Sequence, residues 1–118
     1  MQQDIKDRTF NFGVRIINLI DYLPESNAGK VIGKQVLRSG TSVGANVEEA
    51  HASYSRDEFI FKMNISLKEA RETHYWLRMM KTTNMVKSNR LDDILGEAEE
   101  LKKILGAIVS KSRGKSKK

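Results

Sequence analysis

The sequence predicts an all-α fold, a single antiparallel four-helix bundle of up-down topology. The chain has 118 residues, which suits one domain, and it contains a single proline, which favours helix throughout. Four segments repeat apolar side chains at the steps of three and four that are typical of an amphipathic helix. The connections between these segments are short, and short connections favour antiparallel neighbours.

We predict the first helix from about Asp4 to Leu23. Its main apolar stripe, at steps of four, three and three, is Phe10, Val14, Ile17 and Ile20. Three further apolar side chains widen this stripe: Phe12, Ile16 and Leu23. Gly13 costs the helix about 1 kcal/mol relative to alanine, so it is a candidate for close approach by a neighbour. Pro24 disfavours helical geometry at Leu23 and ends the helix.

The second helix is predicted from about Ala28 to Ser53. Its apolar seam is Ile32, Val36, Val43, Val47 and Ala50, with Ser39 or Gly40 in the missing turn. Gly40 and Gly44 destabilise an isolated helix, so their use predicts that another helix backbone packs close to them. A polar stripe runs beside the seam: Arg38, Ser42, Asn46 and Glu49.

The third helix, from about Arg56 to Thr83, is the longest that we predict. Its seam is Ile60, Met63, Leu67, Ala70, His74 and Leu77. A second apolar set lies off this seam: Phe59, Phe61, Trp76, Met79 and Met80. One stripe is enough for packing within a bundle, so the excess predicts a second contact surface on this helix, such as a subunit interface.

The fourth helix is predicted from about Arg90 to Ser110, with the seam Leu91, Ile94, Leu95, Ala98, Leu101, Leu105 and Ile108. Residues 111–118 contain no apolar side chain, so we predict a disordered basic tail beyond a folded domain of residues 1–110. Side chains before three of the helices are candidate caps: Ser26 or Asn27, Ser55 (with Glu58 at capping-box spacing), and Ser88 or Asn89.

Composition excludes several classes of protein. No cysteine is present, which excludes a disulfide framework, a zinc–thiolate site and thiol catalysis. No apolar run reaches the ~20 residues that cross a membrane, and the polar first residues lack a signal peptide's apolar region. We therefore expect a cytoplasmic protein without a membrane partner. The formal net charge is +6, and five positive charges lie in residues 111–118, which leaves +1 for the remainder.

The histidines do not predict a metal site. Glu48 and His51 have the Glu-x-x-His spacing of di-iron bundles, but a second such pair is required, and His74 has Arg71 at that position. We expect no metal or cofactor. We interpret His51 as solvated or at an interface, and His74 as a hydrogen-bonded core or interface histidine. The polar set includes no strong nucleophile or base, so we expect a protein that is not an enzyme.

Two interpretations of the polar stripe stay open. The first, which we favour, is a hydrogen-bonded network that fixes the register of helices or subunits and consists of the polar stripe with Glu69 and Thr73. The second is that the same residues form a binding site in a groove or channel. Arg71 and Glu72 suit a solvated face. The aromatic side chains on the third helix have the chemistry to stack on unpaired bases, but their helical spacing favours packing: Phe59, Phe61, Tyr75 and Trp76.

The segment from Gln35 to Ala50 resembles the signature of the four-helix-bundle family named after proteins encoded in intervening sequences of bacterial 23S ribosomal RNA. The matching polar positions are Gln35, Arg38, Ser39, Ser42, Asn46 and Glu49, and the aliphatic ones are Val36, Val43 and Val47. A second family segment resembles Ser66, Glu69 and Thr73. Leu37 stands at an often basic position, and Ala50 replaces the usual glycine.

This resemblance implies a ring of identical copies, a pentamer. It also implies similarity to the accessory subunit of diversity-generating retroelements, a basic ring that works with a reverse transcriptase and RNA. We therefore favour a non-enzymatic homo-oligomer that binds RNA or DNA, or a nucleic-acid-processing protein. The candidate phosphate contacts are Arg38, Lys111, Arg113, Lys115, Lys117 and Lys118. The alternative is a structural or adaptor ring that presents a protein-binding surface, with the basic residues as a solubilising end.

Overall fold

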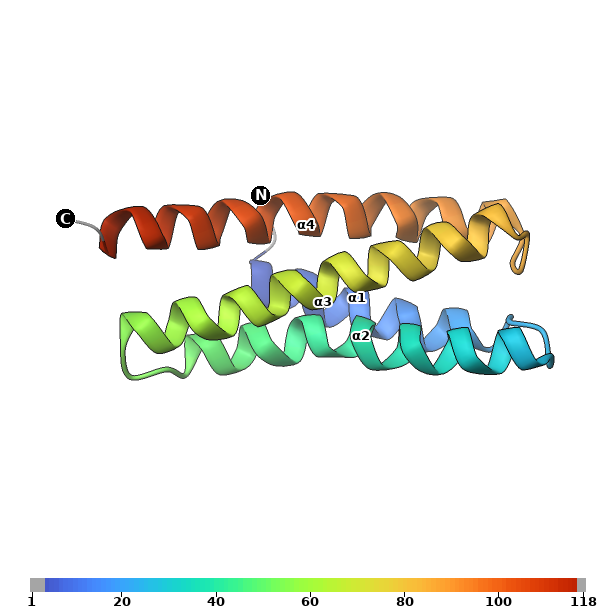
Figure 1. Cartoon of the computed structure of the whole chain (residues 1–118), viewed down its shortest axis with the longest axis horizontal. Helices are drawn as coiled ribbons and strands as arrows, with labels where there is room; N and C mark the ends of the chain where they lie inside the picture. The colour runs from blue at the N-terminus through green and yellow to red at the C-terminus, as the bar shows by residue number, and fades with distance from the viewer. Residues whose placement is uncertain (1–3, 117–118) are drawn as a thin grey trace.

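Four helices and no strand make up residues 4–116, the part of the chain that the computed structural model describes. They are α1 (Ile5–Ile20), α2 (Asn27–His51), α3 (Arg56–Thr82) and α4 (Ser88–Ser116). Consecutive helices run in opposite directions along a body of 50 × 28 × 20 Å (Figure 1). The pairs α1–α2, α2–α3 and α3–α4 pack extensively, and α1–α4 less so. The prediction of an all-α fold of four helices is confirmed.

Serine and aspartate side chains cap the first three helices. Asp4 accepts a hydrogen bond from the backbone N–H of Lys6, and Ser26 accepts one from Gly29 at 3.1 Å. Ser55 accepts one from the N–H of Glu58, and the Glu58 carboxylate reaches back to the N–H of Tyr54. These bonds satisfy N–H groups that have no partner within the helix. The caps predicted at Ser26 and Ser55 are confirmed.

The core follows the predicted seams of α2, α3 and α4 closely. Buried apolar side chains come from all four helices and include Phe12, Ile16, Val36, Val43, Val47, Met63, Leu67, Leu77, Leu91, Leu101 and Leu105. Val109 replaces Ile108 as the fully buried residue near the end of α4. α1 and α4 are also joined by a bidentate ion pair, in which Arg8 donates to both carboxylate oxygens of Glu97 at 2.8 and 2.9 Å.

The main stripe predicted for α1 is not its core face, whereas Phe12 and Ile16, which were predicted to widen that stripe, are buried. Phe10, Val14 and Ile17 are 65, 41 and 49 % exposed, whereas the buried face consists of Thr9, Phe12, Gly13, Ile16 and Leu19. The Thr9 hydroxyl donates to the carbonyl of Ile5 at 2.8 Å, so its burial leaves no unpaired polar group. The rotation of α1 therefore leaves apolar side chains outside the core.

The glycines of α2 explain this rotation. A Cβ atom on Gly40 would lie 2.8 Å from the Ile16 side chain, and one on Gly44 would lie 3.1 Å from the backbone carbonyl group of Thr9. The backbones of α1 and α2 thus approach closely, and only the small-residue face of α1 fits against α2. The predicted close approach of another helix backbone is confirmed at Gly44, whereas the nearest neighbour of Gly40 is the Ile16 side chain.

The second apolar set on α3 is divided between core and surface. Met80 is buried, and Phe59 and Trp76 pack against the core, which leaves Phe61 as its exposed aromatic member. The larger uncovered apolar stripe lies on α1. We therefore correct the predicted location of the second apolar surface from α3 to α1.

Helix α4 continues beyond the predicted end at Ser110 and is helical through Ser116. Its last turns lie beside the first half of α3, where Val109 is buried. Basic side chains in the last turns of a helix also interact favourably with its dipole. The expectation of a disordered segment is therefore corrected for residues 111–116, while 117–118 lie outside the described residues. Within the described part of the chain, no helix is long and apolar enough to span a membrane.

Candidate interaction surfaces

The signature residues meet where α2 crosses α3. Arg38 of α2 contacts two carboxylates of α3: its guanidinium donates to Glu69 at 3.2 Å and also to Glu72. It further contacts the side-chain oxygen of Gln35 at 3.4 Å. The indole N–H of Trp76 donates to Glu72 at 3.0 Å. This hydrogen bond, with help from Arg38, holds the pKa of Glu72 below its usual value.

The buried members of the signature tie the same two helices together. The Thr73 hydroxyl donates to the Ser39 hydroxyl at 2.8 Å, and both side chains are buried. Ser66 donates to the backbone carbonyl of Val43 at 2.7 Å. Because these bonds are specific to one alignment of α2 and α3, they fix the register between the helices.

The remaining signature residues bond within α2 or at its rim. Ser42 donates to the carbonyl of Arg38 at 2.7 Å, and Asn46 donates to the carbonyl of Ser42 at 2.9 Å. Glu49 forms an ion pair with Lys62 at 2.8 Å. The structure thus brings all the predicted network residues to α2 or to its contact with α3. It adds two residues, Glu72 and Lys62, that sequence reasoning did not include.

The histidines are each engaged in local contacts. The His74 Nε2 lies 3.0 Å from a Glu99 oxygen, and the Lys102 ammonium lies 3.3 Å from His74 Nδ1. Burial, with Lys102 beside the ring, lowers the pKa of His74 against the opposing effect of Glu99. The prediction of a hydrogen-bonded histidine is confirmed. His51 lies 2.9 Å from the carbonyl of Val47.

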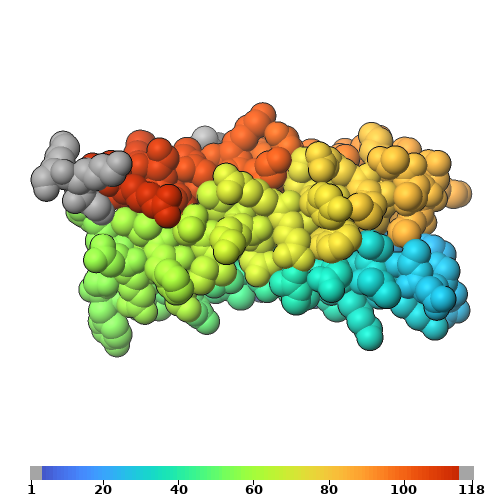
Figure 2. Space-filling model, viewed as in Figure 1, coloured from blue at the N-terminus to red at the C-terminus, as the bar shows by residue number. Residues whose placement is uncertain are grey.

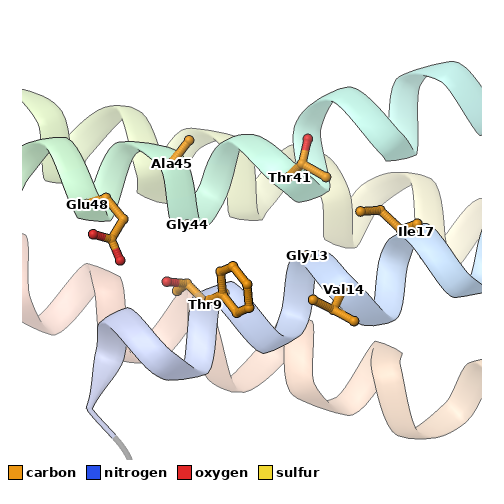
Figure 3. A pocket seen from close by; sticks show the side chains of 9 residues that line it. Thr9, Gly13, Val14, Ile17, Thr41, Gly44, Ala45 and Glu48 are labelled. Atoms are coloured by element: carbon orange, nitrogen blue, oxygen red, sulfur yellow. The ribbon is translucent and has the colours of Figure 1, made fainter.

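An apolar groove runs between α1 and α2, with a cavity volume of about 340 Å³. Figure 3 shows Val14 and Ile17 on its α1 side, and Thr41, Ala45 and Glu48 on its α2 side. Phe10 completes the α1 wall, and the glycines at the helix contact form its floor. Large exposed apolar side chains beside a glycine floor leave room for another helix or side chain to pack.

The outer face of α3 carries cations and aromatic rings. Figure 2 shows α3 at the front of the molecule, between α4 and α2. Lys68, Arg71 and Arg78 are exposed on it and form no ion pair among residues 4–114. Tyr75 lies between the arginines, and the Arg78 guanidinium lies 5.9 Å from its ring centre.

The end of α4 extends this basic surface. Arg113 lines a shallow hollow of about 490 Å³ together with Arg71 of α3, and Lys111 is exposed nearby along the helix. Lys115 is part of α4, although its side chain, like Lys117 and Lys118, lies outside the described part. Arg38 is placed apart from these cations, in the network with Glu69 and Glu72.

Comparison with known proteins gives one family and one solved structure of interest. Residues 1–107 match the family of 23S rRNA-intervening sequence proteins. The fold is similar to the crystal structure of a protein of unknown function from the S23 ribosomal protein family of Bacteroides thetaiotaomicron. The two sequences are 42 % identical over 90 % of this chain and 98 % of that chain, with a TM-score of 0.83. No functionally curated protein is significantly similar to this chain.

Proposed function

This chain belongs to the 23S rRNA-intervening sequence protein family. From its surfaces we propose that it is a non-enzymatic homo-oligomer that binds RNA or another nucleic acid. The observation that carries the proposal is the basic surface, which we define as Lys68, Arg71 and Arg78 of α3 with Arg113 of α4. Lys111 is exposed on another side of α4. Cations without acidic partners attract phosphates without regard to sequence.

Arg38 supports this surface indirectly. Glu69 and Glu72 are the acidic residues of α3 after Glu58, and both are paired with Arg38 on the side of α3 that faces α2. The outer side of α3 therefore keeps its cations unneutralised. Arg38 thus acts in this proposal by pairing two carboxylates, and the basic surface supplies the phosphate contacts.

Salt dependence tests the proposal. We expect structured RNA and single-stranded DNA to bind at low salt, with log Kd depending linearly on log salt. Replacing Lys68, Arg71 and Arg78 by glutamine should lower the magnitude of that slope by about two, since each phosphate contact on a single strand contributes about 0.7. Removing residues 111–118 should lower it further.

A control removes the same charge elsewhere. Lys30, Lys34 and Lys87 are exposed and lie outside the basic surface, so replacing them by glutamine should change the slope much less. Absence of binding at low salt contradicts the proposal. So does equal weakening by the control set and the α3 set.

We also propose that copies of this chain associate through the groove between α1 and α2. Phe10, Val14 and Ile17 expose apolar area that the bundle itself does not cover, and burying such area against a second copy is favourable. The family resemblance suggests a ring, and a pentamer as its size. If the groove receives a different protein instead, the adaptor function is favoured.

A further inference from the structure

Two aromatic rings on α3 are exposed although neighbouring ones are packed. Phe61 and Tyr75 are 62 and 45 % exposed, whereas Phe59 and Trp76 contact the core. Phe61, Lys68 and Tyr75 are spaced by seven residues, or about two helical turns, so they lie along one face. The rings are about 21 Å apart along the helix axis.

The surroundings of Tyr75 suit a flat ligand with a charged backbone. Its ring is held edge-on to Trp76, with 5.0 Å between ring centres and an angle of 71°. Tyr75 and Arg78 line a shallow hollow of about 350 Å³ with Met79, Thr82 and Thr83. The ring is therefore supported from one side, and its exposed surface adjoins an arginine and two hydroxyl groups.

The carboxylates of α3 near this face are paired with an arginine of α2. Beyond Glu58, the carboxylates of α3 are turned towards α2, where Arg38 pairs with both. Lys68, Arg71 and Arg78 therefore flank Tyr75 without a competing acid on α3. A bound strand would meet alternating cationic and aromatic side chains along the helix.

We propose that the outer face of α3 binds single-stranded nucleic acid, with an unpaired base stacked on Tyr75 and phosphates held by Lys68, Arg71 and Arg78. The inference rests on the proposed function and specifies the form of nucleic acid. A basic stripe alone suits duplexes and single strands equally, whereas exposed rings are useful only where base faces are free. Phe61 offers a second stacking position four turns away.

Titration of labelled oligo(U) and oligo(dT), each against a duplex of equal length, tests the inference. We expect either strand to bind more tightly than its duplex and to change the fluorescence of Trp76, the single tryptophan, through its contact with Tyr75. Because oligo(U) and oligo(dT) differ in the base methyl group as well as the sugar, a comparison of oligo(U) with oligo(dU) then identifies the preferred sugar. Equal or tighter binding of the duplex overturns the inference.

Substitutions of exposed tyrosines separate stacking from charge. Tyr75→Leu keeps apolar bulk but removes the aromatic face, so affinity should fall by about 5- to 150-fold with an unchanged salt slope. Tyr75→Phe should retain binding. Tyr54→Leu is the matched control, because Tyr54 is fully exposed in the α2–α3 connection. Circular dichroism checks that each variant is folded.

The outcomes also separate this inference from the proposed function. If Tyr75→Leu binds like the unmodified protein while the glutamine variant of the α3 cations is weakened, stacking is rejected and phosphate binding stands. If the unmodified protein binds none of the oligonucleotides or structured RNA at low salt, both proposals fail. If Tyr54→Leu weakens binding as much as Tyr75→Leu, the assignment of the site to α3 is rejected.

Discussion

Gly44 is the glycine of α2 that lies directly against the backbone of α1. An added methyl group would lie 3.1 Å from two backbone atoms of Thr9, which are unable to move independently of α1. We expect Gly44→Ala to lower the free energy of unfolding by up to about 2 kcal/mol, because overpacking costs about 1–3 kcal/mol and alanine restores about 1 kcal/mol of helix propensity. Urea denaturation followed by circular dichroism measures this change.

Gly96 provides the control for that substitution. It lies in α4, and a methyl group there would meet no heavy atom within 4 Å among the described residues. Alanine favours helix by about 1 kcal/mol over glycine, so Gly96→Ala should stabilise the protein. Equal changes in the free energy of unfolding for the two substitutions would contradict the close contact between the α1 backbone and Gly44.

Glu72 shows which part of the site sequence spacing did not predict. The signature spacing correctly indicated Arg38 and Glu69 as members of a network, but Glu72 was interpreted as part of a solvated face. Its role depends on how α2 crosses α3, because the Arg38 guanidinium spans two carboxylates one turn apart. A local signal did exist, since Trp76 follows Glu72 by four residues and donates to it.

At the scale of elements, α1 shows why an apolar stripe alone did not identify the buried face. Phe10, Val14 and Ile17 have helical spacing equal to that of the core residues. The choice between the two faces depends on the partner helix: Gly40 and Gly44 of α2 admit only a closely fitting surface. Periodicity predicts that a helix is amphipathic, and packing at the glycines decides its rotation.

The α3–α4 contact gives a pH prediction at this scale. His74 has a folded-state pKa below its ordinary value of 6.5. Well above pH 6.5 the ring is neutral in both the folded and the unfolded state, so this histidine costs no stability. As pH falls from 6.5 through the folded-state pKa, the unfolded chain binds the proton first and stability is lost. The free energy of unfolding should therefore be lower at about pH 5.5 than at about pH 7.5.

His74→Gln should make this dependence shallower, because the amide does not titrate. His51→Gln is the control, since His51 contacts α2 and α3 rather than α4. The same urea experiment at the two pH values compares all three proteins. If the free energy of unfolding of His74→Gln depends on pH as strongly as that of the unmodified protein, the role assigned to this histidine is contradicted.

At the scale of the molecule, two surfaces of different chemistry lie on different helix pairs. The apolar groove belongs to α1 and α2, and the basic surface belongs to α3 and α4. Self-association through the groove would therefore leave the basic surface uncovered. Several basic surfaces in one assembly would raise affinity for a long strand without new contacts.

Val14→Lys tests the proposed association. A charge in the groove opposes burial against a second copy, so we expect smaller particles by sedimentation velocity with helix content unchanged. Asn11→Lys is the control, because Asn11 is exposed on α1 but does not line the groove. A monomeric unmodified protein at micromolar concentration rejects self-association. An unchanged size for Val14→Lys rejects the groove as the surface through which copies associate.

Sequence predicted the helix number and most of the core, because four long amphipathic patterns are compatible with few arrangements. The end of α4 was less predictable, since residues 111–116 lack apolar side chains and continue the helix beside the first half of α3. The exposed rings of Phe61 and Tyr75 were equally beyond prediction. All four rings were interpreted from their helical spacing as packing residues, and the placement of α3 distinguishes the exposed pair from Phe59 and Trp76.

The long helix α4 has a consequence for synthesis in the cell. It contributes Leu91, Ile94, Ala98, Leu101, Leu105 and Val109 to the core, and the other three helices precede it in the chain. At about 5–20 residues per second, translation of its 29 residues takes about 1.5–6 s. During that interval the apolar seams of α1 and α3 are not yet covered by α4. The nascent chain is then most open to aggregation and to capture by chaperones.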